Sequence, residues 1–542
     1  MQEKPKLIVL IPAIKKNVAF NDDLVKKIAG IPLIQRVINL AAKLTDLSNI
    51  FLITDSEEIE LIATRNSINF FYDKAVDLTT KPLDVNSFKS IRSQIISTDY
   101  LLWLSPYSPL LELEVINDAI SKLQKSNKVL LQTYKSIDVS QIHQDVESFM
   151  LNFITNQPFY HKTLAKDFFI AKSSLFANTE NKTINKNSIL NYEIPRSLLH
   201  INNFREWWVC EKLLIRKRIV FRVVGNKEVG MGHIFRALTL AHEITDHEVM
   251  FVCSEEDYDA VTKIAGYDYW LGIFKKEKIL QEIINLKPNL VINDMLSTSE
   301  EEVKKLIANK IKVLNFEDVG TGAQFANIVI NELFDRPVLP HKNILWGREN
   351  FFLREEFENA KKHKSFDSVK SILICFGGTD QNNLTQFILD GILNFCITKK
   401  IGIHIVVGPG YSYLKELTEK AKHYKNVELT SGTGVISSIM EKSNLAISSN
   451  GRTVYELAHM NIPAIIISQN EREGTHNFAS KENGFIYVGS INQVDLLDKV
   501  LINLKRLVED SSLRKTLFKN IKRNSFDGNL ERVLKLLYSL LR

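Results

Sequence analysis

The chain has 542 residues and a mass of 62.1 kDa, which at roughly 150 residues per domain predicts about three to four compact units. Hydrophobic residues make up 45% and charged residues 24% of the sequence. These values are those of a globular protein and exclude a largely disordered chain. The net charge of +6 is small and is not gathered into one stripe, so we expect no nucleic-acid partner.

The four cysteines, Cys210, Cys253, Cys375 and Cys396, lie far apart and form no C-x-x-C pair. We interpret them as reduced thiols of the core, not as a zinc site or a disulfide framework. The apolar run at the N-terminus ends at Pro12 and is too short for a secretion signal. Because no apolar stretch is long enough to cross a bilayer, we expect a cytoplasmic protein without a membrane span.

Short apolar strands alternate with amphipathic helices along the first 215 residues. This alternation predicts the α/β class, with parallel sheets and helices on both faces. The polar, Asn- and Lys-rich segment 178–191 is interpreted as a surface loop. The predicted strands are 7–12, 50–54, 100–104 and 129–132, and the predicted helices are 31–44, 57–66, 86–97, 113–125 and 203–215.

Two further series of strands and helices follow a basic run at 216–218. A charged segment, 355–370, separates them, so we predict domains at 1–215, 216–365 and 366–542. The second series has strands at 219–224, 248–253, 289–293, 311–315 and 327–331. The third has strands at 371–376, 402–407, 426–429, 444–448, 463–468 and 485–488, helices at 383–395, 413–423, 451–460, 476–483 and 494–507, and two more helices within 511–541.

The motif Gly230-Met231-Gly232-His233 follows the strand 219–224 and opens a predicted helix over 233–244. Glycine allows a tight turn and a close approach of the backbone to a ligand. The free N–H groups at a helix start favour an anion, and a histidine there can transfer protons near neutral pH. We predict that Gly230 and Gly232 bind a nucleotide and that His233 is catalytic; a turn capped by His233 is the structural alternative.

Four turns of small residues each follow a predicted strand of the third series. In open α/β sheets, ligands bind beyond the carboxyl ends of the strands. The turns therefore predict a nucleotide diphosphate across one sheet edge, with Glu456 accepting hydrogen bonds from ribose hydroxyls. The predicted nucleotide-binding residues of these turns are Gly377, Gly378, Gly408, Ser431, Gly432, Thr433, Asn450, Gly451, Thr453 and Glu456.

Residues 219–542 resemble the UDP-sugar hydrolases of the pseudaminic acid pathway and, more distantly, GT-B glycosyltransferases such as the peptidoglycan enzyme MurG. The resemblance rests on G-M-G-H-I-F-R-A-L-T-L-A (230–241), L-W-G-R-E-N-F-F-L-R-E-E-F (345–357), F-G-G-T-D (376–380) and I-S-S-N-G-R-T-V-Y-E (447–456). It implies a GT-B-type pair of Rossmann-like lobes, with UDP held mainly by the C-terminal lobe. It also implies that His233 is the acid/base and that UDP and a free 2,4-diacetamido-type sugar are the products.

Residues 6–215 are similar to the cytidylyltransferases that make CMP-sialic acid and related CMP-nonulosonates. The resemblance rests on I-P-A (11–13), I-A-G-I-P-L-I (28–34), T-D-S-E-E-I (54–59) and L-S-P-Y-S-P-L-L (104–111). It implies a Rossmann-like nucleotidyltransferase domain. The segment that aligns with the family's phosphate loop has no glycine, although Lys15 and Lys16 there supply charge. The family's Asp-x-Asp metal pair aligns with His200-Ile201-Asn202. Asp55 remains, but a single carboxylate is little support for a metal site. We therefore interpret this domain as degenerate.

The sequence leaves four functions open. The preferred one is a hydrolase that releases UDP from a UDP-linked amino sugar in nonulosonic acid or surface polysaccharide synthesis. The others are a glycosyltransferase with the same donor, a CMP-nonulosonate cytidylyltransferase that would use CTP, and a non-catalytic protein that binds nucleotide sugars. We expect no cofactor or metal in the C-terminal half, and Mg²⁺ only if the N-terminal domain is active.

Overall fold

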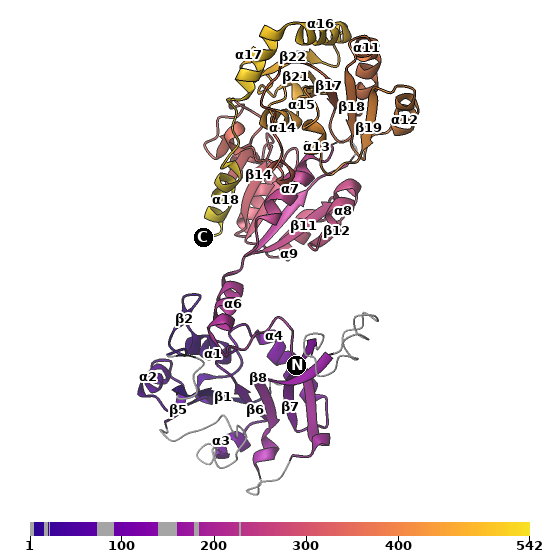
Figure 1. Ribbon diagram of the computed structural model, residues 1–542. Helices are drawn as coiled ribbons and strands as arrows, with labels where there is room; N and C mark the ends of the chain where they lie inside the picture. The colour runs from indigo at the N-terminus through magenta and orange to yellow at the C-terminus, as the bar shows by residue number, and fades with distance from the viewer. Residues whose placement is uncertain are drawn as a thin grey trace. The chain divides into compact units, whose positions relative to one another are not determined.

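The computed structural model of the protein describes residues 5–15, 20, 22–72, 92–138, 160–177, 184–226 and 229–542. The chain forms two compact units, Met1–Arg216 and Lys217–Arg542 (Figure 1). In both units, apolar strands are buried between amphipathic helices, as the α/β pattern predicts. The predicted α/β fold class is confirmed, with one sheet in the first unit and two Rossmann-like lobes in the second.

The first unit is built on a seven-stranded sheet in the order β5-β4-β1-β6-β8-β7-β9. The prediction of a wholly parallel sheet is wrong here, because β8 runs antiparallel to both β6 and β7. An antiparallel strand needs no helical crossover, so strand–helix alternation does not reveal it. The strands are β1 (Leu7–Ala13), β4 (Ile50–Thr54), β5 (Asn69–Tyr72), β6 (Tyr100–Leu104), β7 (Leu130–Asp138), β8 (Tyr160–Lys172) and β9 (Ile189–Glu193), beside a small β2 (Lys27–Ile28) and β3 (Ile31–Pro32) pair.

The helices of the first unit follow the predicted segments. The helix expected at 86–97 is observed only as α3, since residues before 92 lie outside the described part. The loop expected at 178–191 is wrong at its end, where β9 pairs with β7, and 178–183 lie outside the described residues. The helices are α1 (Leu33–Ala41), α2 (Glu57–Arg65), α3 (Arg92–Ile96), α4 (Leu113–Gln124) and α6 (Phe204–Ile215).

The second unit begins with a parallel sheet in the order β12-β11-β10-β13-β14-β15-β16. We call this sheet and its helices the first lobe. Its five predicted strands are confirmed, and two strands at the sheet edges, β12 and β16, were not predicted. The strands are β10 (Arg218–Val223), β11 (Glu248–Ser254), β12 (Trp270–Phe274), β13 (Leu290–Asp294), β14 (Lys312–Phe316), β15 (Ile328–Asn331) and β16 (Ile344–Trp346); the helices are α7 (Gly232–His242), α8 (Tyr258–Ile264), α9 (Ile279–Asn285) and α10 (Glu300–Ala308).

The second lobe is a six-stranded parallel sheet in the order β19-β18-β17-β20-β21-β22. The helix predicted at 476–483 is wrong: a 3-10 turn spans only Lys481–Asn483 there. The strands are β17 (Ser371–Cys375), β18 (Gly402–Val407), β19 (Val427–Ser431), β20 (Leu445–Ser449), β21 (Ala464–Ser468) and β22 (Phe485–Ser490); the helices are α11 (Leu384–Thr398), α12 (Leu414–Lys422), α13 (Ser437–Met440), α14 (Thr453–His459), α15 (Glu471–Gly474), α16 (Leu496–Glu509) and α17 (Ser511–Ile521).

The last helix, α18 (Asn529–Leu540), returns to the first lobe. Its buried residues Val533 and Leu537 pack in the same core as strand β10 and helix α7. Each lobe thus has its own core, and the C-terminal helix fastens the chain that leaves the second lobe onto the first. This path fixes the two sheets in one compact unit, with a set of strand ends from each lobe available to form a site.

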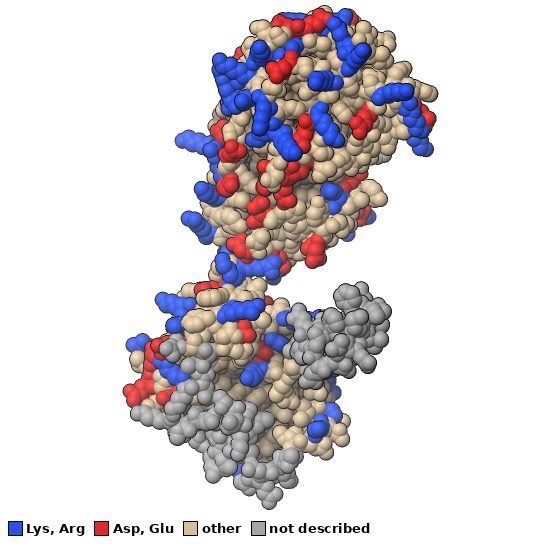
Figure 2. All heavy atoms as spheres, viewed as in Figure 1, with Lys and Arg blue, Asp and Glu red and all other residues tan. Residues whose placement is uncertain are grey.

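The cysteines and the surface charge are as the sequence predicts. The four cysteines are free and buried. Figure 2 shows acidic and basic side chains interspersed on the face in view, with no continuous basic stripe among the described residues of that face. Across the described residues, no helix has the length and apolarity needed to pass through a bilayer.

Candidate functional site

The four predicted turns of the second lobe lie along one edge of its sheet. Their strands, β19, β18, β17 and β20, are neighbours and run parallel, so their carboxyl ends meet at this edge. The backbone N–H of Gly432 donates to the carbonyl of Val407 at 2.9 Å, which joins the turn after β19 to the end of β18. The order of turns along the edge is therefore 431–434, 408–410, 376–380 and 449–453.

Three predicted glycines border open space. Gly230, Gly377 and Gly432 have φ angles of +81°, +79° and +65°, and a Cβ placed on any of them would meet no atom within 4 Å. The positive φ favours glycine at these positions. The empty surroundings leave room for a ligand to approach the backbone.

The glycine motif of the first lobe touches the turns of the second. A Cβ on Gly378 would lie 3.4 Å from the backbone nitrogen of Met231, and one on Gly232 would lie 3.5 Å from Cδ of Arg452. Gly408 packs against the same turn, since a Cβ there would come within 2.2 Å of the Gly378 carbonyl oxygen. The structure thus brings the two predicted halves of the site together.

His233 is the second residue of α7 and is buried beside the end of β13. Its Nδ1 lies 2.6 Å from Oδ1 of Asp294. The two side chains are only 10% and 1% exposed, so little water competes for this contact. The histidine of the motif is therefore anchored by a carboxylate that was not predicted from the sequence.

Arg236, one turn further along α7, donates two hydrogen bonds to the same carboxylate. Its Nε donates to Oδ2 of Asp294 at 2.8 Å and its Nη2 to Oδ1 at 2.5 Å. Burial alone would raise the pKa of Asp294, but the charge and hydrogen bonds of Arg236 outweigh it and hold that pKa at about 2. Asp294 is consequently a fixed anion behind His233.

Glu332, which follows β15, connects this group to the second lobe. Its Oε1 accepts from Nη1 of Arg236 at 2.7 Å and also pairs with Nη1 of Arg452, the residue before α14. Arg452 stacks its guanidinium over the Phe351 ring at 4.5 Å. Burial, with repulsion from Arg236, lowers the pKa of Arg452 to about 9. One buried carboxylate is therefore shared by arginines of both lobes.

Glu317, at the end of β14, makes a second link between the lobes. It is 2% exposed and has φ of +52°, a backbone conformation that is costly for a residue with a side chain. The backbone carbonyl of Glu317 accepts from Nη2 of Arg472 at 2.6 Å. Arg472 belongs to α15 of the second lobe, so this contact also crosses between the sheets.

Two predicted ligand residues already have partners in the protein. Glu456 accepts from Nε and Nη2 of Arg354 at 3.2 and 3.0 Å through its Oε1. The Asn450 amide donates to the carbonyls of Glu473 and His476 at 2.7 and 2.9 Å and so braces the loop after β21. Gly451 and Thr453 stand at the start of α14, Ser431 is the last residue of β19, and Thr433 lies in the turn that follows.

In the first unit, Lys15, one of the two lysines predicted to bind phosphate, is paired with carboxylates. Nζ of Lys15 lies 2.7 Å from Oε2 of Glu58 and 3.1 Å from Oδ1 of Asp22, and the hydrogen bond with Glu58 leads the effects that raise the Lys15 pKa. The Lys15 backbone donates to Asp55 at 2.6 Å. Lys16 lies outside the described residues.

The positions aligned with the family's metal pair do not fit Mg²⁺. His200 Nδ1 lies 3.2 Å from the Ser108 hydroxyl, which donates to Asp167 at 2.7 Å. The Asn202 side chain donates to Glu206 at 3.0 Å. Neither supplies the carboxylate oxygens that Mg²⁺ prefers, and the described residues hold no cluster of three or more His, Cys, Asp or Glu side chains suited to a metal.

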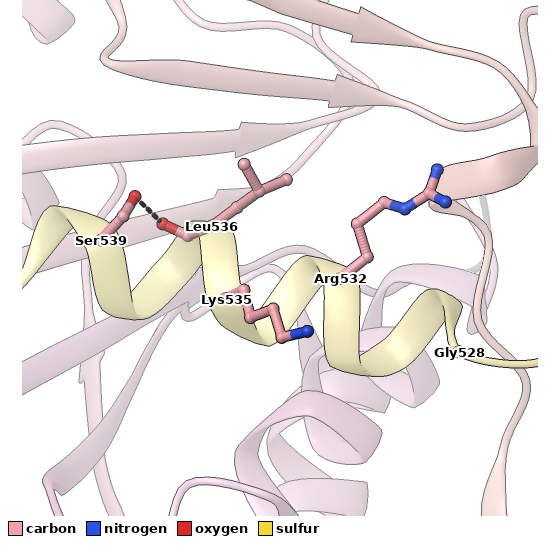
Figure 3. A pocket seen from close by; sticks show the side chains of 5 residues that line it. All are labelled: Gly528, Arg532, Lys535, Leu536 and Ser539. Carbon is pink, nitrogen blue, oxygen red and sulfur yellow. Dashed lines mark hydrogen bonds between the residues drawn. The ribbon is translucent and has the colours of Figure 1, made fainter.

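A hollow of about 400 Å³ lies along α18, apart from the predicted residues. Figure 3 shows that its lining comes from one helix, with Arg532 and Lys535 extending from it. Its lining combines basic and apolar side chains and includes none of the residues predicted for the site. We therefore place the candidate site at the strand ends. The lining residues are Gly528, Arg532, Lys535, Leu536 and Ser539.

Comparison with characterised sequences identifies relatives that cover about half of the chain. The chain is 28% identical over 280 residues to a UDP-2,4-diacetamido-2,4,6-trideoxy-β-L-altropyranose hydrolase of Campylobacter jejuni, covering 49% of the chain and 97% of that enzyme. It is 24% identical over 311 residues to the spore coat polysaccharide biosynthesis protein SpsG of Bacillus subtilis, covering 54% of the chain and 90% of SpsG. The predicted resemblance to this hydrolase family is confirmed.

An uncharacterized protein of Methanocaldococcus jannaschii, MJ1062, is 28% identical over 330 residues, covering 53% of the chain and 67% of that protein. No family model matches the chain. Among solved structures, MurG of Acinetobacter baumannii aligns over 60% of the chain and 99% of MurG with 13% identity and a TM-score of 0.45. A CMP:2-keto-3-deoxy-manno-octonic acid synthetase complexed with CTP aligns over 39% of the chain and 98% of its own, with 10% identity and a TM-score of 0.28.

Proposed function

We propose that residues 217–542 are a hydrolase that releases UDP from a UDP-linked acetamido sugar, in the synthesis of nonulosonic acids or surface polysaccharides. The observation that carries this proposal is the anchored His233 beside the glycine turns of both lobes, where Gly378 approaches Met231 and Gly232 approaches Arg452. The similarity to the Campylobacter hydrolase, which spans 97% of that enzyme, supports the choice of substrate.

In this proposal the turns of the second lobe hold UDP. The backbone at Gly377 and Gly432 borders open space, and successive N–H groups in turns at strand ends form anion-binding concavities. Because the Gly432 N–H itself donates to Val407, the phosphate oxygens are proposed to meet other N–H groups of these turns. Glu456, fixed by Arg354, lies on α14 at the same edge and is proposed to accept a ribose hydroxyl. The sugar then faces the first lobe, on the side of His233.

The proposed reaction is the attack of water on the anomeric carbon of the sugar. His233 takes a proton from the water as its oxygen bonds to that carbon. The bond between the carbon and the phosphate oxygen breaks, and its electron pair leaves with UDP. General base catalysis of this kind contributes about 10² to 10⁴ in rate, so His233 is expected to be essential for turnover.

The test is UDP release from UDP-2,4-diacetamido-2,4,6-trideoxy-β-L-altropyranose without any acceptor. We expect equal amounts of UDP and free sugar from the full-length protein. The His233→Ala variant is expected to lose release by a factor of about 100 or more while still binding UDP in calorimetry. Release that depends on an added sugar or lipid acceptor would identify a glycosyltransferase instead, and binding without turnover on any donor would contradict an enzymatic role.

A further inference from the structure

The hydrogen bond between His233 and Asp294 defines which ring nitrogen faces the substrate. Asp294 is 0% exposed, and its pKa of about 2 keeps it a carboxylate at neutral pH despite the opposing effect of burial. A carboxylate only accepts hydrogen bonds. Since Nδ1 of His233 lies 2.6 Å from its Oδ1, Nδ1 carries the hydrogen, and Nε2 of the neutral ring has the free electron pair.

We propose that Asp294 is a positioning residue, which fixes the Nδ1–H tautomer of His233 and leaves Nε2 as the atom that accepts the proton from water. This inference rests on the proposed function for the reaction that it serves. Asp294 touches neither water nor sugar in this scheme. It acts through the imidazole, which it both orients and stabilises when the ring becomes cationic.

Arg236 makes this arrangement rigid. Its Nη2 lies 3.2 Å from Nδ1 of His233, but both groups are donors, so they do not bond to each other. Instead both donate to the same oxygen, Oδ1 of Asp294. The other oxygen, Oδ2, accepts from Nε of Arg236, so the carboxylate cannot rotate without losing two charge-assisted hydrogen bonds.

The charged groups near His233 come from both lobes. Helix α7 supplies Arg236, and Arg452 directly precedes α14. Strand β13 ends at Asp294, and Glu317 and Glu332 directly follow β14 and β15. Arg472 of α15 lies 3.9 Å from Glu317. Replacing Asp294 with a neutral residue leaves Arg236 beside the ring with one carboxylate fewer. The ring then loses the anchor on its Nδ1.

The first experiment measures the tautomer directly in the full-length wild-type protein. Long-range ¹H–¹⁵N spectra of protein labelled in its 12 histidines, assigned by the His233→Ala difference, separate protonated from bare ring nitrogens. We expect Nδ1 protonated and Nε2 bare for His233 near neutral pH. A protonated Nε2 beside a bare Nδ1 would overturn the inference, and this measurement needs no variant of Asp294 to fold.

The second experiment compares Asp294→Asn with a matched control, Asp318→Asn. Asp318 is equally buried and accepts from Thr298 at 2.6 Å and from Asn315 at 2.6 Å, without a bond to His233. We expect Asp294→Asn to lower kcat by a factor of about 100 or more, with KM and the Kd for UDP near wild type. Asp318→Asn is expected to keep the kcat of its folded fraction.

The outcomes separate this inference from the proposed function. If His233→Ala abolishes UDP release but Asp294→Asn does not lower kcat, the positioning role is wrong and the hydrolase proposal stands. If the tautomer is as expected but the wild-type protein releases no UDP without an acceptor, the hydrolase proposal is wrong and the fixing of the tautomer by Asp294 stands. If His233→Ala still turns over, His233 is not the base and the positioning role of Asp294 is wrong with it. An equal loss in both aspartate variants would assign the effect to general destabilisation and reject the inference.

Discussion

The two units have similar sheet edges, but they differ in the partners of the polar side chains near those edges and in the open space beside them. In the first unit, two of the polar side chains considered for a site have local partners. Lys15, after β1, pairs with Glu58 and Asp22, and His200, between β9 and α6, contacts Ser108. In the second unit, His233 contacts the buried carboxylate of Asp294, and the glycine turns of the site border open space. Two sheets with similar edges therefore differ in the surroundings of their polar side chains. Under the proposed function, only the second unit combines a histidine anchored by buried charges with open space beside its glycine turns.

The largest expected difference between the units concerns their histidines. His233→Ala is expected to reduce UDP release by a factor of about 100 or more, because it removes the proposed general base. His200→Ala, the matched variant in the first unit, is expected to leave release at the wild-type rate. Both rates are measured on the full-length protein with the same donor. A comparable loss in His200→Ala would show that the first unit takes part in the reaction.

The ion pairs of the two units should differ in energy. Glu332→Gln removes a charge with 0% exposure and leaves Arg236 and Arg452 without it, so we expect a loss of about 3–5 kcal/mol in the unfolding free energy of the second unit. Denaturation in urea, followed by circular dichroism, measures this loss. A change below about 1 kcal/mol would mean that the arginines find other partners.

A third prediction concerns pH. Burial raises the pKa of Glu473 to about 7, while a carboxyl in the unfolded chain titrates near about 4.3. The native state therefore keeps a proton that the unfolded state releases, and stability falls as the pH rises between these values. Glu473→Gln is expected to stabilise the protein by up to about 3 kcal/mol at pH 8 and to have little effect at pH 4.

The control for this variant is Glu471→Gln, an exposed residue of the same short helix. Urea unfolding at both pH values is expected to show no pH-dependent gain for the control. A gain of equal size at pH 4 and pH 8 in Glu473→Gln would exclude titration of Glu473 as the cause.

The smallest effect is expected in the first unit. Glu58→Gln breaks the 2.7 Å pair with Lys15, in which the Glu58 side chain is 55% exposed. Exposed pairs of this type contribute about 0–1 kcal/mol, so the unfolding transition of the first unit should hardly move. A loss of unfolding free energy as large as that of Glu332→Gln would contradict the expected difference between the exposed ion pair of the first unit and the buried ion pairs of the second.

The sequence predicted the strands of the second unit well, because its central parallel strands are short, largely apolar runs. It missed β12, whose residues Trp270 and Ile273 are exposed at the sheet edge and carry no clear pattern. It wrongly predicted a helix at 476–483, where Asn450 of another segment fixes the backbone of His476. Tertiary contacts of this kind leave no local periodicity to read.

The site was predicted in part for a similar reason. Glycine turns and the histidine are visible in the sequence because backbone geometry demands glycine at the turns. Asp294 and Glu332 are single carboxylates at strand ends, 61 residues from His233 and 96 residues from Arg236 respectively. No spacing rule joins residues so far apart. The motif contained Arg236, but only the folded structure identifies its partners.

The sharing of Glu332 between Arg236 and Arg452 has a consequence for recombination between relatives. A chimera that takes its first lobe from this protein and its second lobe from a homologue inherits two members, Arg236 and Glu332, of a three-membered ion cluster. Such a hybrid is expected to fold and turn over only if the incoming lobe also brings a cation at the position of Arg452. Compatibility between exchanged halves would then be decided by one buried carboxylate, not by the overall identity of the parents.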